Sequence, residues 1–120
     1  MANKNTESTR FYSDAQEKSV CRALGARQMP NSGATAFKKG DVLHEAASLL
    51  IECKTPMSDK DSFSIKKDWI EKNKVEAFEM RLDNHCIAFN FGPNQPNYYV
   101  IDELTMKFLV EKLIEDRESM

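Results

Sequence analysis

Two short apolar segments separated by only three residues constrain the fold of this chain more than any other feature. Residues 41–44 and 48–54 are rich in valine, leucine and isoleucine, residue types that favour β-strands. The link of residues 45–47 is short enough to join them as an antiparallel hairpin. We therefore expect these segments to be neighbouring central strands of one sheet.

The segments before this hairpin predict a helix and a short strand. Ser13 followed by Gln16 has the form of a capping box, and an apolar stripe leads from there to Gly25, where we expect the helix to end. Residues 1–12 are polar and unpatterned and are predicted to form a mobile arm. Residues 27–39 contain proline, asparagine and glycine, which predict a short strand that runs into a loop.

The second half of the chain predicts two helices and a second hairpin. Residues 65–82 carry apolar side chains among charges and suit a helix packed on the sheet, with Trp69 and Phe78 in its core-facing stripe. Residues 85–91 and 98–101 are aromatic and β-branched and flank a Gly-Pro-Asn-Gln-Pro turn. Asp102 is a good N-cap for a closing amphipathic helix.

This pattern predicts an α+β or α/β fold in one domain over residues 13–120. The order is helix, three strands, helix, two strands, helix, with the helices packed against a mixed sheet of five strands. No run approaches the roughly 20 apolar residues of a membrane-spanning helix. The polar start also lacks the apolar stretch of a signal peptide, so we expect a cytoplasmic protein with no membrane partner.

Charge is distributed unevenly along the chain although the net charge is only −2. Residues 1–67 hold eleven basic against eight acidic residues, whereas residues 68–120 hold six against eleven. Any surface that faces DNA should therefore come from the first half. The three cysteines are widely spaced without a CxxC pair, and buried free thiols are the favoured interpretation.

Three ionisable residues fall at one end of the predicted central hairpin. Asp41 begins one strand, and Glu52 and Lys54 end the next, on the same face because side chains alternate along a strand. Glu17 adds a carboxylate on the apolar stripe of the first helix. Unpaired buried charges cost several kcal/mol, so this set needs partners or a metal ion. The alternative is a simple Glu52–Lys54 salt bridge, with Asp41 capping a turn.

This order of residues resembles the active-site signature of the PD-(D/E)xK, or restriction-endonuclease-like, nucleases. The motif here is Asp41, ten residues, then Glu52-Cys53-Lys54, preceded by the helical Glu17, with Gly40 where the motif's name has proline. Within that superfamily the resemblance is greatest to the archaeal-type Holliday junction resolvases and their phage relatives. It covers roughly residues 13–101 and implies a restriction-endonuclease-like core.

The resemblance implies a magnesium-dependent DNA endonuclease. Asp41, Glu52 and the backbone carbonyl of Cys53 would hold one or two Mg²⁺ ions, for which Mn²⁺ is a possible substitute, and Glu17 would contribute directly or through water. Lys54 would position the attacking water and stabilise charge rather than abstract a proton, because an unperturbed lysine has a pKa of about 10.4.

The predicted DNA contacts surround this motif. A glycine-bearing loop lets main-chain N–H groups approach phosphates closely, and basic pairs stand on both sides of the motif. The candidates are Arg27, Asn31, Ser32, Gly33, Lys38, Lys39, Lys66 and Lys67. The alternative for the two lysine pairs is a solvated, non-functional charge.

The predicted substrate is branched DNA such as a four-way junction, in recombination or repair. A homodimer is expected, because two active sites can nick two strands symmetrically. The apolar stripe of the last helix or the edge of the second hairpin would supply its interface. The alternatives are a restriction, repair or nicking nuclease of the same superfamily, and a catalytically inactive DNA-binding module.

Overall fold

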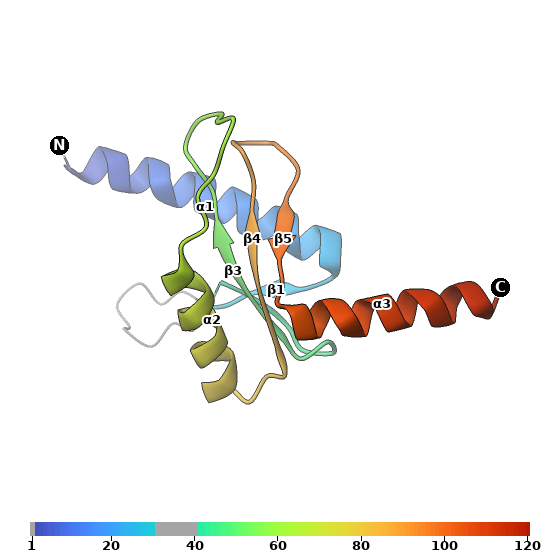
Figure 1. Ribbon diagram of the computed structural model, residues 1–120. Helices are drawn as coiled ribbons and strands as arrows, with labels where there is room; N and C mark the ends of the chain where they lie inside the picture. The colour runs from blue at the N-terminus through green and yellow to red at the C-terminus, as the bar shows by residue number, and fades with distance from the viewer. Residues whose placement is uncertain (1, 31–40) are drawn as a thin grey trace.

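The protein is an α+β fold with one mixed sheet of five strands and three helices (Figure 1). The computed structural model describes residues 2–30 and 41–120, with side chains from Thr9 onward. The predicted order of elements is confirmed. The elements are α1 (Ala2–Leu24), β1 (Arg27–Gln28), β2 (Val42–His44), β3 (Leu49–Lys54), α2 (Lys67–Glu79), β4 (Asn84–Phe89), β5 (Tyr98–Val100) and α3 (Glu103–Glu118).

The strands lie in the order β1-β2-β3-β4-β5, so the predicted central hairpin, β2 and β3, is inside the sheet. β2 and β3 are antiparallel, with Val42 opposite Ile51, as the short link predicts. β3 and β4 are parallel, and α2 makes the crossover between them that parallel neighbours require. β4 and β5 form the second predicted hairpin.

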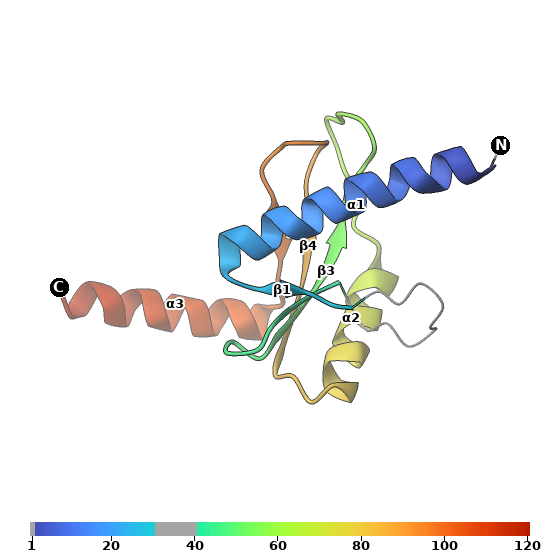
Figure 2. The same cartoon turned by 180° about the vertical axis from the view of Figure 1, so that it is seen from behind.

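The main core lies between the sheet and α1. Figures 1 and 2 show α1 crossing one face of the sheet, behind the strands in the first view and in front of them in the second. Alternate strand residues point to it, and the buried cluster consists of Val20, Val42, Ile51, Cys86 and Ala88. Leu50 and Ile87, which alternate with these residues, are fully buried as well.

The first helix begins at Ala2 rather than Ser13, so the prediction of an unpatterned arm over residues 1–12 is wrong for Ala2 to Tyr12. No glycine or proline occurs before Gly25, and nothing in the local sequence therefore interrupts the helix. Ser13 and Gln16 are mid-helix residues and form no capping box. Gly25 adopts a φ of 69°, which ends the helix as expected.

The face of α2 that packs on the sheet is more polar than predicted. Asn73, Glu76 and Ala77 are its buried residues, whereas Val75 and Phe78 are exposed. The prediction that Phe78 packs in the core is therefore wrong. Asn73 donates a hydrogen bond of 3.4 Å to the Leu50 carbonyl, so the strand backbone supplies a partner for a polar side chain on this face.

α3 begins as predicted but does not pack against the sheet. Asp102 caps it by accepting a hydrogen bond of 2.9 Å from the Thr105 N–H. None of its residues is buried, and the helix projects away from the body of the molecule in both views (Figures 1 and 2). In the part of the chain that the structure describes, no helix is long and apolar enough to cross a membrane.

The core assignment predicts a contrast between two valines. Val42→Ala should lower the free energy of unfolding by about 2 kcal/mol, because two buried methyl groups are lost and a cavity remains. Val75→Ala, at a side chain that is 56% exposed on α2, should change it by less than about 0.5 kcal/mol. Urea denaturation followed by circular dichroism measures both. Equal effects would contradict the placement of Val42 in the core.

Candidate active site

The end of the central hairpin fixes Asp41 against β3. The pairing of β2 with β3 ends at Val42 and Ile51, so β3 continues beyond its neighbour. Here the Asp41 Oδ2 atom accepts a hydrogen bond of 2.8 Å from the Cys53 N–H, and the Asp41 N–H donates to the Ile51 carbonyl at 3.2 Å. The carboxylate thus satisfies a strand N–H that β2 no longer reaches.

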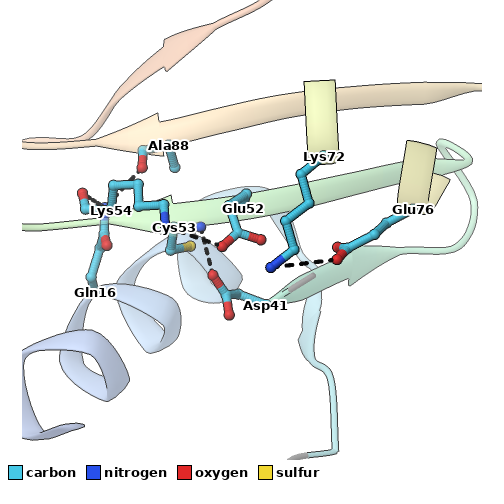
Figure 3. A network of polar contacts seen from close by, with 8 residues as sticks. All are labelled: Gln16, Asp41, Glu52, Cys53, Lys54, Lys72, Glu76 and Ala88. Carbon is cyan, nitrogen blue, oxygen red and sulfur yellow. Dashed lines mark hydrogen bonds and ion pairs between the residues drawn. The ribbon is translucent and has the colours of Figure 1, made fainter. Parts of the chain in front are cut away.

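Glu52 lies beside this carboxylate in a largely buried position (Figure 3). Its side chain is only 18% exposed. Burial and, secondarily, the negative charge of Asp41 together raise the pKa of Glu52 to about 7, while Lys54 acts in the opposite direction. Two neighbouring acidic groups repel each other when both are ionised, a condition that favours binding of a cation.

Lys54 lies on the same side of β3 as Glu52, as the alternation of side chains predicts. Its Nζ atom is 3.6 Å from Glu52 Oε1 and 4.6 Å from the centroid of the Trp69 ring. The ring of α2 and the carboxylate of β3 together hold the ammonium group in place. Sequence reasoning favoured core packing for Trp69, with stacking on unpaired bases as the alternative. Its contact with Lys54 depends on the crossover of α2, which no local pattern reveals.

α1 contributes Glu17 and Gln16 from the other side of the sheet. Glu17 is 8% exposed and accepts a hydrogen bond of 3.2 Å from Gln28 Nε2, which confirms its buried position. Gln16 was missed as a site residue. Its Nε2 atom donates to the main-chain carbonyls of Lys54 at 3.0 Å and of Ala88 at 3.2 Å, so it ties α1 to the end of β3. The sequence contained one indication of this buried position. Gln16 precedes Val20 by four residues, so both side chains lie on the same face of α1.

One cleft of about 560 Å³ joins these residues. All four predicted catalytic residues, Asp41, Glu52, Lys54 and Glu17, lie along it. The rest of its lining is Thr9, Arg10, Ser13, Asp14, Gln28, Met29 and Cys53. Arg10 adds a cation that sequence reasoning missed, because it falls in the segment that was expected to be an arm.

The donors in this cleft suit a hard, hydrated cation. Within residues 2–30 and 41–120, no group of three or more His, Cys, Asp or Glu side chains is arranged as a metal centre. Asp41 and Glu52 supply two carboxylates, and the predicted third donor is a main-chain carbonyl, that of Cys53. Mg²⁺ uses one or two carboxylates and retains several waters, so the residues fit a partly hydrated Mg²⁺ or Mn²⁺ rather than a fully protein-coordinated ion.

The predicted DNA contacts are only partly described by the structure. Arg27 forms an ion pair of 2.6 Å with Glu45 and is not among the residues that line the cleft. Lys66 has its Nζ atom 5.7 Å from the Trp69 ring centroid, near Lys54, whereas Lys67 pairs with Glu71 on the exposed surface of α2. The candidates that lie outside the described residues are Asn31, Ser32, Gly33, Lys38 and Lys39.

The three cysteines are free, and Cys86 is buried while Cys21 and Cys53 are partly buried. Burial raises the pKa of Cys86 to about 12, and burial with the nearby Asp41 charge raises the pKa of the Cys53 thiol as well. A thiol with a raised pKa is a poor nucleophile. The side chain of Cys53 therefore does not act as the reactive group of this cleft.

Comparisons with protein-family models, with curated proteins and with solved structures found no match. The family resemblance therefore rests on the order of the motif residues and on their meeting in this cleft.

The buried charge of Glu52 predicts a pH-dependent cost to stability. Because its pKa is higher in the folded than in the unfolded state, folding is favoured at low pH and loses stability as the pH rises from about 4.5 through about 7. Glu52→Gln should therefore raise the free energy of unfolding at pH 8 in EDTA, by up to about 3 kcal/mol. The gain should shrink progressively below pH 7.

Urea denaturation at pH 8 and pH 5 measures this difference. Glu71→Gln is the matched control, because its carboxylate is exposed on α2, and it should change stability by less than about 0.5 kcal/mol at either pH. A Glu52→Gln variant that is less stable than the parent at pH 8 would show that the carboxylate is well compensated in the folded protein.

Proposed function

We propose that the protein is a Mg²⁺-dependent endonuclease of the PD-(D/E)xK type that hydrolyses phosphodiester bonds in branched DNA. The convergence of Asp41, Glu52, Lys54 and Glu17 in one cleft, with the buried Glu52 carboxyl beside Asp41, carries this proposal. These residues come from α1 and from the central hairpin. The order of elements around the mixed sheet also supports a restriction-endonuclease-like core.

Asp41 and Glu52 would hold the metal ion, with the Cys53 carbonyl as third donor. When bound, Mg²⁺ lowers the pKa of a coordinated water and neutralises charge that develops on the phosphate. The hydrogen bond from the Cys53 N–H fixes the Asp41 carboxylate beside Glu52. Glu17 acts through water, because it comes from α1 and already accepts a hydrogen bond from Gln28.

Lys54 positions the attacking water and stabilises negative charge on the phosphate. Its ammonium group lies close to both Glu52 and the Trp69 ring, which hold it in place. Proton abstraction by Lys54 would require the neutral amine. Its fixed position suits orientation of a reactant, which can contribute several kcal/mol to catalysis.

Branched DNA, four-way junctions above all, is proposed as the substrate on the resemblance to the resolvases. Arg10 in the cleft and Lys66 beside Trp69 are available to neutralise phosphates near the metal. A homodimer would present two such clefts to the two strands that a junction resolvase must cut. The proposed setting is the cytoplasm of a bacterium or of a phage-infected host.

The first test is cleavage of a synthetic four-way junction with and without Mg²⁺. The parent protein should cut it only with the metal, and Asp41→Asn should lower the rate at least about 100-fold, because it removes charge that holds the ion. Asp61→Asn, in an exposed loop away from the cleft lining, is the matched control and should cut at the parent rate.

Parallel reactions with a linear duplex of the same sequence define the substrate class. Equal cleavage of duplex and junction would replace the resolvase assignment by a general restriction, repair or nicking nuclease. Junction binding without cleavage in Mg²⁺ or Mn²⁺ would identify an inactive DNA-binding module. Cleavage that persists in Asp41→Asn would refute the assignment of this cleft.

Trp69 is proposed as a positioning residue, and its test separates kcat from KM. Trp69→Leu should lower kcat about 2- to 30-fold, as expected for loss of a cation–π contact, with KM little changed. Trp69→Phe retains a ring and should recover part of the rate. A loss of folding cooperativity in urea with both variants, or a change in KM alone, would assign Trp69 a structural or DNA-binding role instead.

A further inference from the structure

One side of α3 exposes a row of apolar side chains. We define the α3 stripe as Met106, Leu109, Val110, Leu113 and Ile114, whose side chains are between 42% and 65% exposed. With about 100° between successive helical residues, these five fall within an arc of about 140°. That width is typical of a helix face buried against another element, yet no residue of α3 is buried.

A helix of this kind needs a partner to be stable. α3 has 16 residues, only just above the length of about 12–15 residues below which isolated helices are marginal in water, and helices in proteins gain most of their stability from packing of one face. The Asp102 cap contributes only about 1 kcal/mol. Exposed apolar stripes bordered by charges mark interaction sites in soluble proteins, so the α3 stripe is interpreted as a docking surface.

The charges at the two ends of the α3 stripe indicate which partner fits. Glu103 and Arg117 stand seven residues before and seven after Val110, so they lie on nearly the same line along the helix as Val110. If two α3 helices pack antiparallel about a two-fold axis near Val110, Glu103 comes to the same end of the interface as Arg117 of the partner subunit. The symmetry creates this opposite-charge pairing twice. A parallel arrangement would place like charges together at both ends.

The net charge of α3 argues against a membrane or nucleic acid as the partner. The helix carries five acidic residues against three basic ones. Surfaces that dock on anionic lipid headgroups or on phosphates are basic instead. A second copy of the same helix supplies both an apolar stripe and the complementary charges.

We propose that the protein forms a homodimer through antiparallel packing of α3 against α3 of a second copy. The inference deepens the proposed function by naming the partner and its surface, but the interface itself does not depend on nuclease chemistry. Five apolar residues on each side make a small interface, and interfaces of this class are weak. The dissociation constant is therefore expected on the order of micromolar.

Sedimentation equilibrium of the full chain from about 1 to 200 µM, without DNA or metal, tests this interface. Leu113→Asp should abolish the dimer, because it buries a charge in the α3 stripe. Leu104→Asp makes the same kind of change on α3 outside the stripe and should leave dimerisation unchanged. Circular dichroism checks that both variants keep the folded sheet.

Charge reversal distinguishes antiparallel from parallel packing. Glu103→Arg and Arg117→Glu should each weaken the dimer about tenfold, and the double variant should restore it, because both pairs are again complementary. Lys112→Glu, which changes net charge as Arg117→Glu does but lies outside the stripe, should have little effect. In a parallel dimer neither single reversal would weaken association, since like charges already face each other.

Several outcomes would overturn the proposal. These are a monomer at every concentration, a dimer that survives Leu113→Asp, and a double charge reversal that does not restore association. Binding of α3 to the second copy's body instead of its α3 would appear as a dimer insensitive to the charge reversals. The sedimentation experiment measures the mass of the assembly without DNA. It therefore tests the interface even if the protein cuts no DNA. If it does cut, Leu113→Asp should convert paired junction nicks into single nicks.

Discussion

The hydrogen bond between the Cys53 N–H and the Asp41 carboxylate is the contact on which the site depends. β2 is only three residues long, and β3 extends past its end with backbone groups that need partners. A side-chain oxygen supplies one of them and is thereby fixed next to Glu52. The same hairpin that forms the centre of the sheet therefore positions two carboxylates, and the shortness of β2 leaves the open edge that the cleft occupies. Glu17 of α1 reaches this edge from the other face of the sheet.

Electrostatic strain is concentrated at this edge. Glu52 is held beside another carboxylate in a buried position. Its raised pKa reflects the free energy of folding that is lost when this carboxyl group is ionised in the folded protein. Lys54 offsets only part of this cost. Sites of this kind are less stable than an apolar alternative would be, and such strain is commonly found where a ligand supplies the missing compensation. In the proposed enzyme, a divalent cation held by Asp41 and Glu52 would offset the cost of burying the Glu52 charge and its repulsion by Asp41.

Local patterns predicted the elements and the motif, because both depend on short-range periodicity. The alternation along β3 placed Glu52 and Lys54 on one face, and the apolar stripe of α1 placed Glu17 in a buried position. The errors come from contacts between distant segments. Gln16 was assigned to a cap that does not exist, whereas it bonds the backbone of two strands. α2 buries Asn73 and Glu76 rather than Val75 and Phe78, because the polar groups find partners on the sheet and on Lys72.

The charge of the cleft lining differs from the charge of the sequence half that forms it, because Arg10 and Lys54 stand beside four acidic residues, Asp14, Glu17, Asp41 and Glu52. Every residue that lines the cleft lies between Thr9 and Lys54, within the half of the sequence that is net basic. The strand order places β1 and β2 at one side of the sheet and β5 at the opposite edge, and the acidic α3 leaves from that far edge (Figure 1). Exposed charges separated by more than about 10 Å are largely screened at ordinary salt. In the proposed endonuclease, a bound metal ion would therefore have to offset this acidic lining before DNA could approach.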